Sequence, residues 1–362
     1  MIALVSEGQA PGSVSQQAHG DVPTIEAPRA TAALARLFRR SLAQGSVNPL
    51  LPLLRHYHGV LAPLAIAEST HAASQERAPH VPITLSELQR AVIALPSLPQ
   101  AVQEALAALQ AEGISATAIA ERIEHDQAMV ARTLRAANTA FYGAPGRVAT
   151  IRAAISILGL RAVSALLTAV AVSARFPAQA NIPLNFKQFW RGALTTAIIA
   201  RELAPVVRLD ADVAFTAALL HDVGVLALAT SFPAAYGTVQ QYAHQADVPL
   251  WQAERVVLGV DHGVAGELLA HRWHLPAVIT SAIAAHHAPP ASTGSGTATL
   301  TELVHIADAL AHGVVPQEDA HEAVPEVSVD IWSRFNVSVE LCLDVLRSSG
   351  AAADALCEAL AS

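Results

Sequence analysis

Residues 215–226 read FTAALLHDVGVL, an apolar run of helical character that is interrupted by His221 and Asp222. Burying an imidazole and a carboxylate side by side is costly unless each of them finds a partner. The run therefore predicts a helix in the core of the protein, with polar partners that come from other parts of the chain.

Three later stretches supply suitable partners for this pair: Asp261-His262, His286-His287 and Asp308. Nitrogen and oxygen donors of this kind suit a divalent metal. Neighbouring helical residues lie ~100° apart, so both members of the pair reach one ion only if a helix end points at it. Taken singly, a histidine is more often a hydrogen-bonded core residue than a ligand, and in a chain with 16 histidines some pairs will occur by chance.

The composition predicts an all-α protein, and breaks in the helical pattern predict that it is built of two packed helical subdomains. Hydrophobic residues make up 52% of the 362 residues, and much of this share is alanine, which favours helix. Aromatic residues are only 4%, and stretches typical of strands are hard to find. No glycine-rich phosphate loop, repeat of fixed period or heptad pattern occurs in the sequence.

The charge pattern and the cysteines indicate the class of partner and the compartment. The formal net charge is −8, and Lys187 is the only lysine. Without a basic block, nucleic acid is not expected as the main partner. Cys342 and Cys357 form neither a disulfide framework nor a zinc motif, so a reducing cytoplasm is expected.

Neither a signal peptide nor a membrane span is expected. The first residues, MIALVSEGQAPG, lack a positive region and a sufficiently long apolar run. The segment 162–174 is apolar but shorter than the ~20 residues that span a bilayer, so a buried helix is predicted there.

Breaks in the helical pattern divide the chain. Residues 1–30 predict a flexible tail, and 31–80 predict an N-terminal helical appendage, either packing on the rest or docking a partner. The main domain is expected over 83–312, with subdomains at 83–176 and 184–312, and residues 324–362 predict C-terminal helices.

In the first subdomain Ser97, Asp126 and Thr150 are predicted N-caps. In the second, one helix is expected over 212–229.

Several of these segments resemble a known family. The chain is similar to the bacterial HDOD proteins, the HD-related output domains of signalling systems in the HD superfamily. The turn from Asn138 to Gly143, followed by AISILGL, is the part specific to HDOD proteins. The segments that carry the resemblance are LPSLPQAVQEAL (95–106), HDQAMVARTLRAANTAFYG (125–143), TIRAAISILGLRAV (150–163), FWRGAL (189–194), AALLHDVGVLAL (217–228), DHGVAGELLAHRWHLP (261–276) and AIAAHH (282–287).

The resemblance implies that the second subdomain is an HD-like helical bundle with a metal site. By position, His221 and Asp222 match the family's dyad. His262 matches the histidine of the following helix, His286 and His287 match the pair used for a second metal, and Asp308 matches the closing aspartate. Candidate metal ligands, in remnant form, are therefore His221, Asp222, His262, His286, His287 and Asp308.

Departures from the superfamily pattern bear on catalysis. Gly192 stands where the opening histidine ligand is expected, and Val225 stands where cyclic-dinucleotide phosphodiesterases carry a lysine. Their Gly-Tyr-Pro segment is replaced by Ala288-Pro289-Pro290. Metal-assisted hydrolysis needs an ion that activates water and a charge that stabilises the phosphate. The departures therefore favour a pseudoenzyme with no catalytic residues and either no cofactor or a weakly bound divalent metal.

Three functions remain open from the sequence. The favoured one is a regulatory output protein that binds a signalling protein or a nucleotide second messenger. The second is an active phosphohydrolase in which His262 or a water replaces the missing ligand. The third is a nucleic-acid-associated regulator, based on Arg132, Arg135, Arg147 and Arg152, although arginines on helices are usually just a solvated face.

Overall fold

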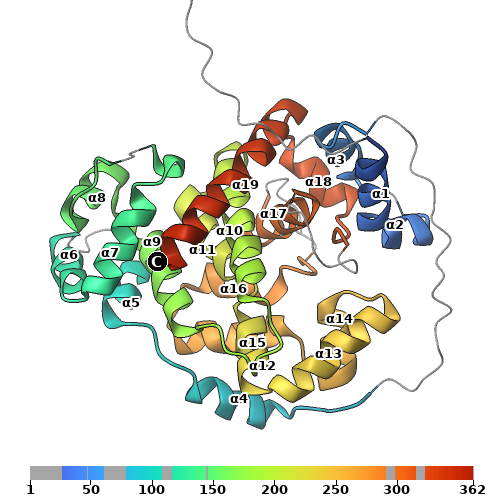
Figure 1. Cartoon of the computed structure of the whole chain (residues 1–362), viewed down its shortest axis with the longest axis horizontal. Helices are drawn as coiled ribbons and strands as arrows, with labels where there is room; N and C mark the ends of the chain where they lie inside the picture. Colours follow the sequence, from blue (N-terminus) through green and yellow to red (C-terminus); the bar gives the residue numbers. More distant parts are fainter. Residues whose placement is uncertain are drawn as a thin grey trace, which may run out of the picture.

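The computed structural model describes residues 27–46, 48–60, 79–107, 116–143, 146–290, 298–314 and 323–361. Every regular element in these ranges is a helix, as the composition predicted (Figure 1). The linker expected around residues 74–82 lies mostly outside the described residues, as do most of the predicted tail and part of the loop at 294–299.

The N-terminal appendage consists of α1 (Ala27–Leu37), α2 (Arg39–Gln44) and α3 (Leu51–Tyr57). Residues 27–30, expected in the flexible tail, form the first turn of α1. The appendage contacts the C-terminal part of the chain, because the Val324 amide donates to Leu37 O and Asn48 Nδ2 donates to Pro325 O. Leu54 and the His58 ring approach Gly313 at the end of a later helix.

The first subdomain is a group of short helices around α9 (Figure 1). Its elements are α4 (Leu85–Ala94), α5 (Gln100–Ala107), α6 (Ala116–Glu124), α7 (Gln127–Ala137), η1 (Ala140–Tyr142), α8 (Ile151–Leu158) and α9 (Leu160–Arg175). Asp126 and Thr150 accept hydrogen bonds from the amides of Met129 and Ala153, which confirms both predicted caps.

Two features of this subdomain differ from the local expectation. α5 begins at Gln100, and Ser97 accepts a hydrogen bond from the Arg272 side chain instead of capping the helix. α4 lies apart from α5–α9 and packs against helices of the second subdomain, where the Ile83 amide donates to Leu258 O (Figure 1). Contacts distant in the chain therefore decide the placement of both segments.

The helices of the second subdomain surround the apolar run at residues 215–226. Its elements, with the C-terminal helices, are α10 (Phe186–Leu203), η2 (Ala204–Val207), α11 (Ala211–Leu220), α12 (Val223–Ser231), α13 (Pro233–Ala246), α14 (Leu250–Leu258), α15 (His262–Arg272), α16 (Ala277–Ala285), α17 (Leu300–Val314), α18 (Val329–Phe335) and α19 (Val339–Ala361). α10 packs on α11, α17 and α19, and α19 also reaches α7, so the C-terminal helix joins the two subdomains (Figure 1).

The helix predicted over 212–229 is broken at the dyad. α11 ends at Leu220 and α12 begins at Val223, while Asp222 adopts φ −98° and ψ 13°. This turn directs both side chains of the dyad to one place, which a regular helix cannot do. By length and composition the stretch Ala211–Ser231 could cross a membrane, but 83% of its most apolar window is buried inside the protein.

Candidate metal centre

His221 projects from the turn between α11 and α12 and is only 2% exposed. Its Nδ1 donates to Ala218 O at 2.6 Å, one turn earlier in α11. Because that contact places the proton on Nδ1, the Nε2 atom of the neutral ring is left with a lone pair. Nε2 lies 3.2 Å from Asp222 Oδ2 and 3.3 Å from Asp308 Oδ1, the latter residue coming from α17.

His262 and His286 are oriented in the same manner. His262 is the first residue of α15, which Asp261 caps, and its Nδ1 lies 2.7 Å from Glu254 Oε2. His286 follows the last residue of α16, and its Nδ1 donates to Ile283 O at 2.8 Å. Both Nε2 atoms point at Asp222 Oδ1, at 3.2 Å for His262 and 3.3 Å for His286. Fixing one ring nitrogen so that the other faces a common point is typical of metal-bound histidines.

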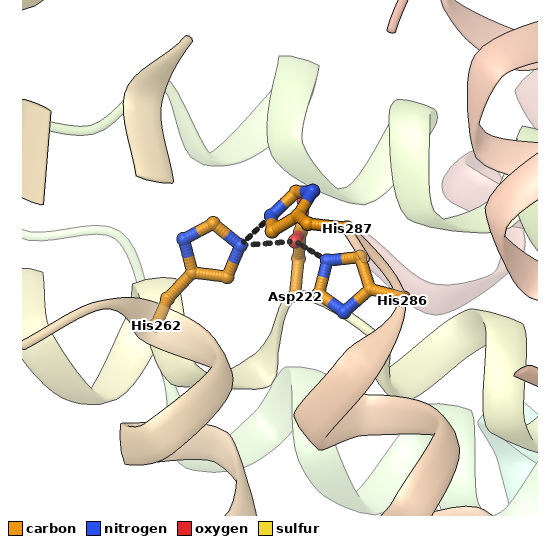
Figure 2. A group of neighbouring side chains, drawn as sticks. All are labelled: Asp222, His262, His286 and His287. Carbon is orange, nitrogen blue, oxygen red and sulfur yellow. Dashed lines mark hydrogen bonds and ion pairs between the residues drawn. The ribbon is translucent and has the colours of Figure 1, made fainter. Parts of the chain in front are cut away.

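His287 completes one side of the group. Its Nε2 lies 2.6 Å from His262 Nε2, and its ring stacks on Trp251 with centroids 5.6 Å apart. Figure 2 shows Asp222 facing the imidazoles of His262 and His286, with His287 beside them. Each of these four residues offers a ligand atom, and these atoms all lie within 4.8 Å of one another.

The structure thus brings together all six residues proposed from the sequence, in two groups that share Asp222. Oδ1 of Asp222 faces His262 and His286, with His287 beside His262, whereas Oδ2 faces His221, which in turn contacts Asp308. His262 therefore belongs to the first group, so it does not stand in for a ligand missing beside His221 and Asp308. His312, one turn after Asp308 in α17, places Nδ1 3.3 Å from the Asp308 carboxylate.

Electrostatics inside the group favour a positive charge. Burial opposes ionisation of all these groups, but Asp222 and Asp308 together raise the pKa of His221 well above its ordinary value. Burial also lowers the pKa of His262, but the neighbouring carboxylates of Glu254 and Asp222 outweigh it and raise this pKa well above its ordinary value. The neighbouring histidines hold the pKa of Asp222 well below its usual range. Burial, followed by the charges of His286 and His262, lowers the pKa of His287.

The residues fit a divalent ion. Asp222 Oδ1 and His286 Nε2 are buried and lie 3.3 Å apart, but neither atom has a contact with hydrogen-bond geometry among the described residues. Buried polar atoms of this kind are costly unless a partner such as a bound ion satisfies them. Three imidazole nitrogens and one carboxylate oxygen form a donor set that suits Zn²⁺ or a related transition metal.

A cavity of about 1530 Å³ opens onto this group. Gly192 from α10 and Val225 from α12 line it, as do His221 and Asp222. The N-terminal appendage also lines it, with Arg36, Arg39 and Arg40 of α1 and α2. The cavity therefore combines residues from the appendage with those of the predicted metal site.

Sequence reasoning missed Glu254, Tyr236, Trp251 and His312. The available signal for Glu254 was a single charged residue among the apolar residues of α14 that face the core, Ala253, Val257 and Leu258. Its contact with His262 depends on the turn between α14 and α15. The contact with Tyr236 depends on how α13 packs against α14, which no local pattern specifies.

Comparisons with known proteins agree with this architecture. A model of the HDOD domain family matches residues 95–289. A crystal structure from Shewanella amazonensis, provisionally named a phosphohydrolase, shares 25% identity and a TM-score of 0.61, covering 75% of this chain and 97% of that one. An HDOD domain protein of unknown function from Geobacter sulfurreducens shares 24% identity and a TM-score of 0.62, covering 74% and 97%.

A curated relative with no characterised function extends the comparison to Treponema pallidum. It is 26% identical over 198 residues, which make up 54% of this chain but only 38% of the relative's own length. Its similarity therefore concerns one part of a longer protein. Since the family model covers more than half of this chain, and the fold matches solved HDOD structures, the chain belongs to the HDOD domain family.

Proposed function

We propose that this chain is a non-catalytic regulatory member of the HDOD family that keeps a weak divalent-metal site. In this proposal it acts in the cytoplasm of a bacterium by binding a signalling protein or a nucleotide second messenger. One observation supports the proposal: four metal-ligand residues converge at the cavity, while Gly192 and Val225 line the same cavity and supply neither a donor nor a charge.

The four residues that would hold the ion are Asp222, His262, His286 and His287. A bound ion of this kind lowers the pKa of water and neutralises developing charge on a phosphate. The chain's own part is to orient His262 and His286 through their Nδ1 contacts and to place the Asp222 carboxylate between them, while His287 stacks on Trp251. This supports ion binding independently of hydrolysis.

Gly192 and Val225 argue against hydrolysis. Gly192 has no side chain with which to complete the half of the site formed by His221 and Asp308, and Val225 cannot stabilise an anionic phosphate. Neither lysine nor another cation beside the dyad replaces Val225 among the described residues that line the cavity; the arginines lie on the appendage wall. Removing a charge clamp or a first donor in comparable sites costs about 10²–10³ in rate.

The test combines metal content with turnover by the purified full chain. Wild type is expected to bind about one Co²⁺ or Zn²⁺ and to leave both a cyclic dinucleotide and bis(p-nitrophenyl) phosphate intact. His221→Ala serves as the control for contaminating activity. Turnover that disappears in His221→Ala contradicts the non-catalytic proposal, whereas failure to bind any ion contradicts the metal site.

An active phosphohydrolase is the second candidate, and one observation favours it. His312 lies one turn after Asp308, lines the cavity and approaches the Asp308 carboxylate, so a further imidazole lies close to the half of the site that lacks a ligand. If this candidate is correct, phosphodiester hydrolysis with added Mn²⁺ or Co²⁺ is lost in His312→Ala as well as in His221→Ala.

Nucleic acid has no part in this proposal. Of the four arginines considered from the sequence, Arg152 pairs with Glu121 and Glu124, and Arg135 donates to Ala359 O in α19. Arginines that already bind acidic side chains or backbone oxygens of the protein contribute less to a phosphate-binding surface than arginines that face solvent. Salt-dependent DNA or RNA binding that weakens in Arg132→Ala or Arg147→Ala would revive the idea.

A further inference from the structure

Glu254 is a fully buried carboxylate next to the metal centre, with 0% of its surface exposed. Its Oε2 accepts hydrogen bonds from the backbone amide and from Nδ1 of His262, both at 2.7 Å. Its Oε1 accepts a hydrogen bond from the Tyr236 hydroxyl at 3.0 Å, and Tyr236 is also fully buried. The three residues form one chain of contacts, from α13 through α14 to the start of α15.

The fold by itself gives no reason for a charge at this position. Among the described residues, the ion pair of Glu254 is with His262, and no arginine or lysine is paired with it. Burying a carboxylate without a fixed cation is costly, and well-packed apolar residues often replace such groups without loss. The neighbours of Glu254 on α14 include Ala253 and Val257, which are fully buried and apolar. Because burying Glu254 is costly and packing does not require it, we expect that its role is to act on His262.

His262 differs from the other two oriented histidines in the kind of acceptor that holds it. Nδ1 of His221 and Nδ1 of His286 donate to backbone carbonyl groups, which are neutral. Nδ1 of His262 instead faces a carboxylate. A carboxylate behind a metal-bound histidine both fixes the ring and increases the basicity of the far nitrogen. His262 therefore has the strongest donor nitrogen of the three.

We propose that Glu254, held in place by Tyr236, is the positioning residue that makes His262 the anchoring ligand of the metal centre. This inference rests on the ion binding of the proposed function and adds the residues that control it. Because the Tyr236 hydroxyl occupies Oε1, Oε2 is directed at His262, and the far nitrogen of the ring stays aimed at Asp222 Oδ1.

The experiment measures Co²⁺ binding by the full chain, by calorimetry and by the visible spectrum of the bound ion. Glu254→Gln preserves shape and a hydrogen-bond acceptor but removes the charge. It is expected to weaken Co²⁺ binding by about 10–100-fold. Glu254→Asp keeps the charge on a shorter side chain and is expected to recover part of this loss. Tyr236→Phe is expected to weaken binding less than Glu254→Gln does.

Glu302→Gln is the matched control. Glu302 is likewise 0% exposed, but it pairs with Arg334, outside the metal centre. This variant is expected to lose thermal stability and yet bind Co²⁺ with the wild-type affinity and spectrum. A purely structural role for Glu254 predicts that both variants behave alike, with reduced stability and unchanged Co²⁺ affinity.

A second readout does not require the ion. In the metal-free protein, ¹⁵N NMR of the imidazoles is expected to show a strongly hydrogen-bonded proton on His262 Nδ1, shifted upfield in Glu254→Gln. If wild type binds Co²⁺ and Glu254→Gln binds it equally well, the role of Glu254 is refuted while the metal site stands. If wild type binds no Co²⁺, the proposed metal site fails and this inference fails with it.

Discussion

Two glycines beside the metal centre have opposite surroundings. A Cβ atom at Gly224 in α12 would lie 1.9 Å from His262 O and 2.6 Å from Gly266 N in α15. A Cβ atom at Gly192 in α10 would meet nothing within 4 Å. Gly224 therefore sets the closest approach of two backbones, whereas Gly192 leaves open space at the cavity wall.

Gly224→Ala is expected to destabilise the protein and to damage the metal centre. The added methyl group must push α15, and His262 with it, away from Asp222. Overpacking of this kind costs about 1–3 kcal/mol. Urea denaturation measures the loss of stability, and Co²⁺ titration measures the loss of affinity. Gly237→Ala in α13, where a Cβ atom has open space, is the control and is expected to be neutral or stabilising.

Gly192→His is expected to raise the amount of bound Co²⁺ from about one to about two ions per chain, because it adds a donor for the half of the site formed by His221 and Asp308, where a side chain has open space. Gly192→Ala is the control for the helix itself. It removes the flexibility of glycine within α10 and is expected to stabilise the protein by about 0.5–1 kcal/mol without changing the affinity for Co²⁺. Equal amounts of bound Co²⁺ in both variants would show that residue 192 does not contribute to the half of the site formed by His221 and Asp308.

At the scale of elements, α2 is bonded to the residue that follows α13, and the residues of this contact line the cavity. Arg39 Nε and Nη2 donate to the carboxylate of Asp247, and Arg40 Nε donates to its backbone oxygen. Asp247 ends α13 with φ 49°, a conformation that aspartate and asparagine tolerate better than most residues. These contacts place the arginine-bearing wall of the cavity.

Asp247→Asn is expected to lower the free energy of unfolding by about 1–2 kcal/mol at pH 7, because it removes the charge while keeping a residue suited to this backbone. The pKa of Asp247 is lowered: partial burial opposes ionisation, but hydrogen bonds from Arg39 and the charge of Arg40 outweigh it.

A lowered carboxyl pKa fixes the direction of the pH effect. The stabilisation is present above the unfolded-state pKa of about 3.9 and is lost as the pH falls through the folded-state value. Urea denaturation of wild type and Asp247→Asn at pH 7 and pH 3 is expected to show a difference that shrinks in acid. A difference of the same size at both pH values would rule out an ionic origin. Asp344→Asn, at an exposed pair with Arg347, is the control and should change little.

At the scale of the whole molecule, a bound ion would join three separate parts of the chain. The four residues that would hold it come from the turn between α11 and α12, the start of α15 and the segment that directly follows α16. An ion bound by the folded state alone adds about 2.7 kcal/mol of stability at a hundredfold excess over the dissociation constant.

Addition of Co²⁺ or Zn²⁺ is therefore expected to raise the unfolding temperature by a few degrees, and a chelator is expected to reverse the change. Calorimetry measures both. His286→Ala should abolish the response, because it removes a buried candidate ligand. His271→Ala should leave the response intact, because His271 is largely exposed on α15. A response that persists in His286→Ala would place the ion elsewhere.

Most helices could be predicted from the sequence because their signals are local. The buried helix predicted over 162–174 lies within α9 (Leu160–Arg175), and Asp126 and Thr150 cap their helices as expected. Caps and helical periodicity act over a single turn, so they leave a trace in the order of residues. The candidate ligand set was likewise named from its order along the chain.

Only the tertiary structure decided how these parts meet. The turn formed by His221 and Asp222 gives each carboxylate oxygen of Asp222 its own neighbours, and the buried Glu254 accepts a hydrogen bond from Nδ1 of His262. Arg39 and Asp247 are 208 residues apart in the chain, and nothing in either neighbourhood indicates their contact. The amino-acid sequence alone determined the helices and the donors, because those depend on short-range forces. Which donors face one another depends on the packing of distant helices, which the sequence specifies only through the complete fold.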